Sequence, residues 1–283
     1  MNAKRLAMIL LPLMLVLLAA CGGPKNDFQA PPADADVNVA VSILPQQYFV
    51  KKVGGVHVSV MVMAGPGVNP LTYAPSKDQL RALKARDIVF LMGIPPETTW
   101  LPEIQKAAPD IVLVDIGQGV PKINDDPHIW LSPRLVKTQA ETIAQALIAA
   151  DPAHEADYRA NLEAFQAELD ALDEDIRRVM EQNHVAGKTF IVNHPAWGYF
   201  AADYGLKMVS IPENATEAQL QELASLAQDK GIDAIFYQRG FDEESPQKLA
   251  AMIQGRTVPL EPLNPSWEAN LRSVALMLAK SAR

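Results

Sequence analysis

Short runs of β-branched and other apolar residues alternate with amphipathic stretches from residue 37 onward. This alternation is typical of strands and helices that build mostly parallel sheets. The runs predicted as strands form two sets of four: 39–43, 58–63, 88–92 and 111–114, then 189–192, 207–211, 234–237 and 257–260. We therefore expect an α/β fold with two lobes, each with a mostly parallel four-stranded sheet flanked by helices.

The most regular apolar pattern lies between the two sets of strands. Seven residues recur there at alternating spacings of four and three: Tyr158, Leu162, Phe165, Leu169, Leu172, Ile176 and Val179. That spacing places them on one stripe of a helix. Asp151 and Pro152 are typical of a helix start, and Gly187 of a helix end. About thirty residues would make a rod of roughly 45 Å, so we predict one long helix that joins the lobes rather than a coiled-coil dimer.

The first 36 residues have a different character. Two basic residues precede the uncharged apolar stretch 6–20, which is typical of a secretory signal and too short to span a bilayer comfortably. Leu18-Ala19-Ala20-Cys21 resembles a bacterial lipobox, and Cys21, the only cysteine, stands where the lipid is attached. The predicted parts are a signal peptide (1–20), a lipidated tether (21–36), an N-terminal lobe (37–150), a bridging helix (151–186) and a C-terminal lobe (187–283).

Composition narrows the classes of function. Among 283 residues, 49% are hydrophobic and 20% charged, which is the balance of a folded globular chain. A net charge of −8 argues against a nucleic-acid partner held through phosphates. One cysteine excludes internal disulfides and cysteine-based zinc cages. We expect a monomer, lipid-anchored in the cell envelope on the periplasmic or extracytoplasmic side.

Candidate chemistry lies in the loops, because open α/β sheets bind ligands beyond the carboxyl ends of their strands. Segment 193–200 follows the fifth predicted strand and contains His194, and segment 125–133 holds His128 between two prolines at a helix entrance. We expect both histidines in the region between the lobes. The other histidines, His57, His154 and His184, we interpret as exposed or capping residues.

Four motifs carry a family resemblance: PGVNPLTYAP (66–75), DPHIWLSP (126–133), NHPAWGYFAADYGL (193–206) and EPL (261–263). Through them the chain resembles the metal-binding solute receptors of ABC importers for zinc, manganese and iron, the TroA-like or cluster A-I family. The resemblance covers essentially all of 37–283. It implies two α/β lobes bridged by one long helix, with a metal ion held in the cleft by ligands from both lobes.

Residue by residue, the resemblance implies a metal site formed by His128, His194 and Glu261, with Glu261 where the family usually has aspartate. Leu71 stands at the position of the family's first histidine, Gln238 at that of a common glutamate, and Ala215-Thr216 at that of a frequent Glu-Pro. The His- and acid-rich loop of many zinc members is reduced here to 117–126.

Two imidazoles and a carboxylate suffice to hold zinc with one position open, which water, Asn69, Tyr73 or Gln238 would fill. Imidazole also suits iron, nickel and copper, so the ligands do not select the metal. We expect zinc first, with manganese or iron as alternatives. Because one histidine is missing, we expect weaker or differently selective binding.

These features support a receptor that delivers a divalent metal ion to an ABC permease. An alternative is the same scaffold with a degenerate metal site, which binds a non-metal ligand or acts without transport. A hydrolytic zinc enzyme is a third hypothesis. The chain has no H-E-x-x-H motif and no evident spare carboxylate for a general base, so we expect no enzyme activity.

Overall fold

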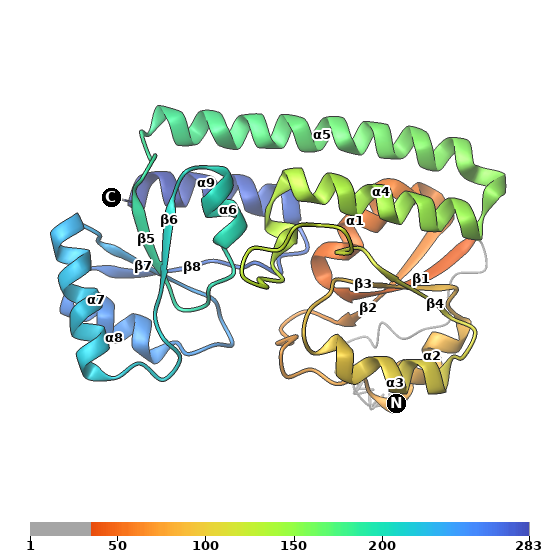
Figure 1. Ribbon diagram of the computed structural model, residues 1–283, viewed down its shortest axis with the longest axis horizontal. Helices are drawn as coiled ribbons and strands as arrows, with labels where there is room; N and C mark the ends of the chain where they lie inside the picture. The colour runs from red at the N-terminus through yellow and green to blue at the C-terminus, as the bar shows by residue number, and fades with distance from the viewer. Residues whose placement is uncertain (1–34, 283) are drawn as a thin grey trace, which may run out of the picture.

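Two four-stranded parallel sheets lie beneath a single long helix in the computed structural model, which describes residues 35–282 (Figure 1). The first sheet has the order β2-β1-β3-β4 and the second β6-β5-β7-β8. The strands are β1 (Val37–Ile43), β2 (Val58–Ala64), β3 (Ile88–Leu91), β4 (Val112–Asp115), β5 (Thr189–Val192), β6 (Lys207–Ser210), β7 (Ala234–Tyr237) and β8 (Arg256–Pro259). The predicted fold class is confirmed, and every predicted strand overlaps an observed one.

Helices cover both faces of each sheet. In the N-terminal lobe, α1 and α4 lie on the side of the long helix and α2 and α3 on the opposite side (Figure 1). The helices are α1 (Leu44–Gly54), α2 (Lys77–Ala82), α3 (Glu97–Ala107), α4 (Pro133–Ala150), α5 (Glu155–Gln182), α6 (Gly198–Asp203), α7 (Glu217–Lys230), α8 (Glu244–Met252) and α9 (Trp267–Ser281). Since both faces are covered, the inner strands β3 and β5 are buried along their whole length and read as continuous apolar runs.

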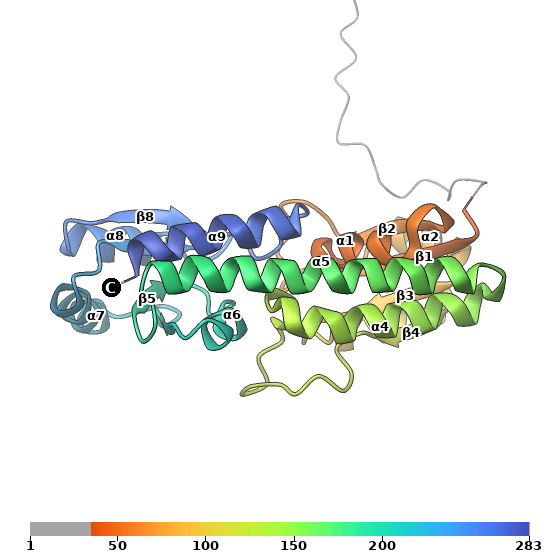
Figure 2. The ribbon, with the colours of Figure 1, turned by 90° about the horizontal axis from the view of Figure 1, so that it is seen from above.

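The long helix α5 runs over both lobes, as Figure 2 shows from above. It has 28 residues, about 42 Å at 1.5 Å per residue. It is shorter than the predicted range 151–186 at both ends. Asp151 and Pro152 open a short 3₁₀ turn (Pro152–His154) before α5, and His184 takes a left-handed φ of 52° beyond its end.

The apolar stripe of α5 lies against the lobes as predicted. Five of its seven residues are buried: Tyr158, Phe165, Leu169, Leu172 and Ile176. The other two, Leu162 and Val179, are partly buried and pack against the same core. No helix among the described residues is long and apolar enough to cross a membrane. The predicted signal peptide and Cys21 lie outside the described residues.

Aromatic side chains join the two lobes under α5. Trp267, at the start of α9, packs edge-on against Phe49 of α1 with ring centroids 5.0 Å apart. Tyr48 of α1 contacts Phe165 of α5 and donates a 2.9 Å hydrogen bond to Glu268. The indole nitrogen of Trp267 also donates to the backbone carbonyl of Trp130 at 2.7 Å. These contacts fix the position of the C-terminal lobe relative to the N-terminal lobe.

We predict that Trp267→Phe lowers the free energy of unfolding by about 1–3 kcal/mol. The variant keeps an aromatic ring but leaves the buried carbonyl of Trp130 without its donor and removes part of a packed indole. The measurement is urea-induced unfolding in the presence of a chelator. Leu276→Ala, at a position of the same helix that is 48% exposed, is the control and should change stability by less than about 0.5 kcal/mol. Equal effects of the two substitutions would contradict the role of Trp267.

Candidate functional site

Two histidines from opposite lobes meet between them. His128 directly precedes the 3₁₀ turn Ile129–Leu131 that leads into α4, and His194 follows β5. Their Nε2 atoms lie 3.1 Å apart. Two imidazoles bound to one tetrahedral zinc ion at 2.0–2.1 Å would have their nitrogens about 3.3 Å apart. The observed spacing is therefore close to that of two ligands of one ion.

Asp126 orients the ring of His128. One carboxylate oxygen, Oδ1, lies 2.6 Å from Nδ1 of His128 and accepts a 2.9 Å hydrogen bond from its backbone N–H. A proton on Nδ1 leaves the lone pair of Nε2 free and directed at His194. Metal-bound histidines in proteins usually donate their other ring nitrogen in this way.

The C-terminal lobe holds the loop that contains Asp126. The hydroxyl of Tyr199 donates to the Asp126 carbonyl at 2.9 Å and accepts from the backbone N–H of Ile123 at 3.0 Å. Gly198 allows a close approach, since a Cβ there would lie 2.8 Å from Oδ2 of Asp126. Tyr199, with Trp130 and Trp197, is buried, as expected for packing residues.

The imidazole of His194 is neutral at ordinary pH. Burial, together with the neighbouring His128, lowers the pKa of His194 to about 4. Its ring stacks on Phe241, with centroids 4.1 Å apart and planes 25° apart. The adjacent Asn193 accepts a hydrogen bond from the backbone N–H of Gln238 at 2.9 Å and donates to the Asp242 carbonyl at 2.9 Å. These bonds hold the loop after β7 against His194.

Glu261 does not form a close triad with the two histidines. Among residues 35–282, the only group of three His, Cys, Asp or Glu ligand atoms that all lie within 4.8 Å is Asp36, His57 and His154. Glu261 lines a hollow of about 350 Å³ together with Asn69 and Gln238. The two histidines line a separate cavity of about 30 Å³.

The two hollows are neighbours, because Gln238, Phe241 and Leu263 line both. Oε1 of Gln238 and Oε1 of Glu261 are buried without a hydrogen-bond partner. Burial raises the pKa of Glu261, although Arg239 stands 3.9 Å away. Gln238, which lines both hollows, therefore has an oxygen free to bind a cation, whereas Glu261 lines only the larger hollow and pairs with Arg239.

The remaining candidates of the sequence lie in different places. Leu71 lines the cavity of the two histidines, so a side chain at this position faces the site. Asn69 lines the larger hollow and accepts a 2.9 Å hydrogen bond from the backbone N–H of Leu71. Tyr73 lines neither hollow and packs edge-on against Trp100 at 4.9 Å. The structure thus places Tyr73 in the packing of the N-terminal lobe.

Several residues that support the candidate site or its surroundings were not predicted from the sequence. Asp126 was part of a recognised motif, and its position two residues before His128 was the available signal for its orienting role. No pattern indicated Phe241, which reaches His194 only through the fold of the loop after β7. Thr216, at the position of a frequent family Glu-Pro, caps α7 and accepts from the backbone N–H of Gln219 at 3.3 Å.

The interpretation of three histidines as exposed or capping is confirmed only for His184, which is exposed. It is wrong for His57 and His154, which are partly buried and stack on each other with ring centroids 3.9 Å apart. His154 stands at the N-cap position of α5, but its side chain does not cap the helix. The two rings meet because η1 (Gly55–His57) packs against the start of α5.

Comparisons with known proteins place the chain in a family. A family model described as "ZnuA: Zinc-uptake complex component A periplasmic" matches residues 39–280. The zinc-binding lipoprotein AdcA of Streptococcus pneumoniae is 26% identical over 95% of this chain and 57% of its own length. The manganese-binding lipoprotein MntA of Bacillus subtilis is 25% identical over 84% of this chain and 80% of its own length.

Solved structures agree with these matches. A crystal structure of ZnuA superposes with a TM-score of 0.83 at 37% identity and covers 88% of this chain and 99% of that chain. The chain spans just over half the length of AdcA but nearly all of the ZnuA structure. Because the family model covers most of the sequence, the chain belongs to the family of zinc-uptake complex component A, ZnuA.

Proposed function

We propose that this chain is an extracytoplasmic solute receptor that captures a divalent transition metal ion between its lobes and delivers it to an ABC permease. The observation that carries the proposal is the 3.1 Å approach of His128 and His194 from opposite lobes. The hydrogen bond from Asp126 supports it, because it leaves Nε2 of His128 free to bind an ion. Zinc is the expected cargo, with manganese or iron as alternatives, since the related proteins are named for zinc and manganese.

The proposed ligand set is His128, His194 and Glu261. Glu261 would bind the ion after its side chain or its loop moves toward the histidines. The movement would be short, because the hollow that Glu261 lines adjoins the cavity of the histidines at Gln238. Gln238, which lines both hollows, and Asn69, which lines the larger one, are the polar side chains that would complete the shell with water. Leu71 occupies the side of the cavity from which a third imidazole would otherwise reach the ion.

Attachment to the membrane is part of the same proposal. The lipobox-like Leu18-Ala19-Ala20-Cys21 would place a lipid on Cys21, and residues 22–36 would tether the lobes near the permease. We propose that the receptor acts as a monomer, because the ligands that we assign come from the two lobes of one chain. No catalytic role is assigned to any residue.

We predict that zinc co-purifies with the wild-type protein and that His194→Ala and His128→Ala each weaken the tight site at least about 100-fold, because each removes a direct ligand. The measurement is elemental analysis of protein purified without chelator, followed by competition with a chromophoric zinc chelator. His184→Ala, at an exposed position, is the control and should leave the affinity unchanged. A folded wild-type chain that binds no transition metal would favour the alternative of a non-metal ligand.

Asp126→Asn is predicted to weaken zinc binding by about 10–100-fold without removing a ligand. The amide has nearly the same shape as the carboxylate but loses its negative charge, so the orientation and basicity of the His128 ring are less well supported. Asp125→Asn is the matched control, because Asp125 is the exposed neighbour and its positive φ of 57° suits asparagine. If both variants bind zinc like the wild type, Asp126 does not support the ligand.

The Leu71→His variant is predicted to bind zinc at least about tenfold more tightly than the wild type. Leu71 lines the cavity of His128 and His194, so a histidine there supplies a third imidazole to the same ion. Leu71→Gln tests whether polarity alone produces the gain and should have a much smaller effect. No gain for Leu71→His over Leu71→Gln, in the same chelator competition, would mean that the ion does not lie where we propose.

A further inference from the structure

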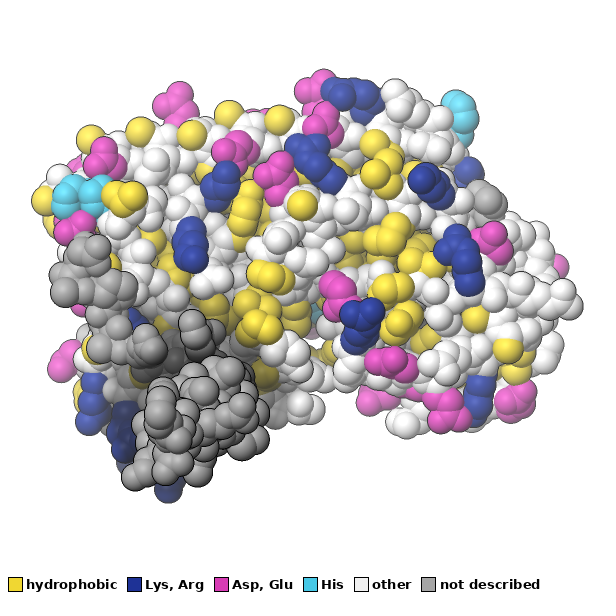
Figure 3. Space-filling model, turned by 180° about the vertical axis from the view of Figure 1, so that it is seen from behind, with side chains coloured by type: hydrophobic (Ala, Val, Ile, Leu, Met, Phe, Trp, Pro, Cys, Tyr) yellow, Lys and Arg dark blue, Asp and Glu magenta, His cyan; other side chains and the backbone are white. Residues whose placement is uncertain are grey.

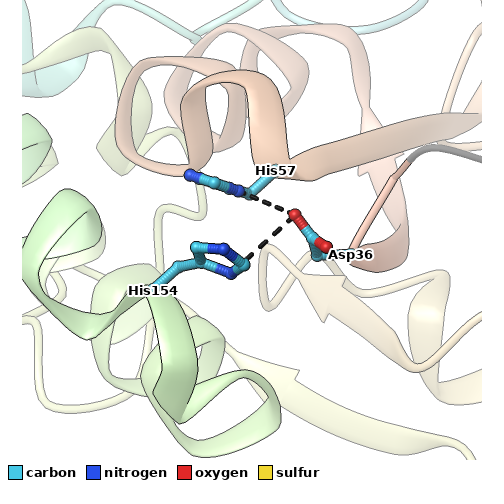
Figure 4. Close-up of side chains that lie close together, drawn as sticks. All are labelled: Asp36, His57 and His154. Atoms are coloured by element: carbon cyan, nitrogen blue, oxygen red, sulfur yellow. Dashed lines mark hydrogen bonds and ion pairs between the residues drawn. The ribbon is translucent and has the colours of Figure 1, made fainter.

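A second cluster of potential metal ligands lies outside the cleft, where the turn before β2 packs against the start of α5 (Figure 4). It consists of Asp36, His57 and His154. Asp36 precedes β1 and His57 precedes β2, so both stand at the amino ends of their strands. His194, in contrast, lies beyond the carboxyl end of β5. His57 therefore lies at the amino ends of the strands of the first sheet, whereas His194 lies at the carboxyl ends of the strands of the second sheet.

The three side chains converge on one oxygen atom. Oδ2 of Asp36 lies 2.7 Å from Nδ1 of His57 and 3.8 Å from Nδ1 of His154, as the dashed lines in Figure 4 show. The two imidazole rings are stacked, with centroids 3.9 Å apart and planes 24° apart. One ligand atom from each residue lies within 4.8 Å of the others.

We propose that Asp36, His57 and His154 form a second site for a divalent transition metal ion, separate from the cargo site. Ligands at 2.0–2.2 Å from a tetrahedral zinc ion lie about 3.3 Å from one another, between the two observed distances from Asp36. The two distances from Asp36 each differ from that spacing by about 0.5–0.6 Å. Two imidazole nitrogens and one carboxylate oxygen suit zinc, cobalt, nickel or copper better than magnesium or calcium.

The three ligand atoms are not all hydrogen-bonded to one another. The distance of 3.8 Å between Asp36 and His154 is too long for a hydrogen bond. Nδ1 of His154 instead pairs with Oδ2 of Asp151 at 2.7 Å. A single ion bound by the three atoms would replace the present hydrogen bonds of His57 to Asp36 and of His154 to Asp151.

Neighbouring carboxylates support a cation at this place. Oδ2 of Asp157 lies 3.0 Å from Nε2 of His57, the ring nitrogen opposite the proposed ligand atom. This is the pairing by which a carboxylate orients a metal-bound histidine. Asp151, which also accepts a 2.7 Å hydrogen bond from Tyr158, adds further negative charge beside His154. Three carboxylates around two imidazoles offset the charge of a divalent ion.

The site is partly open to solvent. The side chains of Asp36 and His154 are 42% and 34% exposed, so an ion would enter without movement of the lobes. Figure 3 shows histidine side chains next to acidic ones on the surface at this end of the N-terminal lobe. Greater exposure predicts weaker binding than in the cleft, where His128 is 12% exposed.

An ion at this site would connect three segments that are far apart in sequence: the entry to β1, the turn before β2 and the start of α5. Its role would be structural, because it would fasten the bridging helix to the N-terminal lobe. A ligand that binds only the folded state raises stability in proportion to the logarithm of its concentration above Kd.

The experiment uses the full chain with both His128→Ala and His194→Ala. This double variant, the cleft variant, lacks the two histidines of the proposed cargo site. We expect this variant to bind one zinc or cobalt ion per chain by equilibrium dialysis and to gain thermal stability when zinc is added. Adding His154→Ala should lower the remaining affinity at least about tenfold and remove the gain in Tm. In the otherwise wild-type chain, His154→Ala should leave the cleft affinity unchanged.

Two further variants keep the test decisive. His154→Gln replaces the imidazole with a neutral polar side chain, and circular dichroism verifies the fold of each variant before titration. His184→Ala on the cleft-variant background is the matched control and should retain the ion. The proposal is overturned if the cleft variant binds no ion, or if its ion is held equally well after both His154 substitutions. Neither result bears on the cleft site, which is tested by its own variants.

Discussion

The meeting of two imidazoles from different lobes is the constraint on which the candidate cargo site depends. A nitrogen-to-nitrogen distance of 3.1 Å tolerates little relative motion of the lobes. The structure meets this demand with α5, which packs along both lobes, and with the aromatic contacts of Trp267 to α1. The site therefore depends on rigid packing far from the histidines, because a shift of one lobe by about an ångström would separate the two imidazoles.

Most of the fold was predictable because the strands are buried on both faces. A parallel strand covered by helices has no polar face, so β3 and β5 appear in the sequence as short continuous apolar runs. The ends of α5 were less accessible to prediction. Pro152 begins a 3₁₀ turn and His184 takes a left-handed conformation, and neither choice is fixed by the apolar stripe.

The site was predictable where local sequence determines geometry. His128 lies between prolines at a helix entrance and His194 directly follows a strand, and the structure brings them together. The distance of Glu261 from them depends on how the loops after β7 and β8 fold, which no local pattern encodes. The stacking of His57 on His154 likewise arises only when two distant turns pack together.

The side chain at position 238 is neutral, although it lies next to both candidate ligand groups. Gln238 is 8% exposed and stands between the histidines and Glu261, where its amide carries no charge. A divalent ion bound by two neutral imidazoles and the carboxylate of Glu261 would have only one anion in direct contact and would depend on Asp126, behind the ring of His128, for a second negative charge. Because that charge would act through the imidazole, such a site would hold an ion less tightly than one with two directly bound carboxylates.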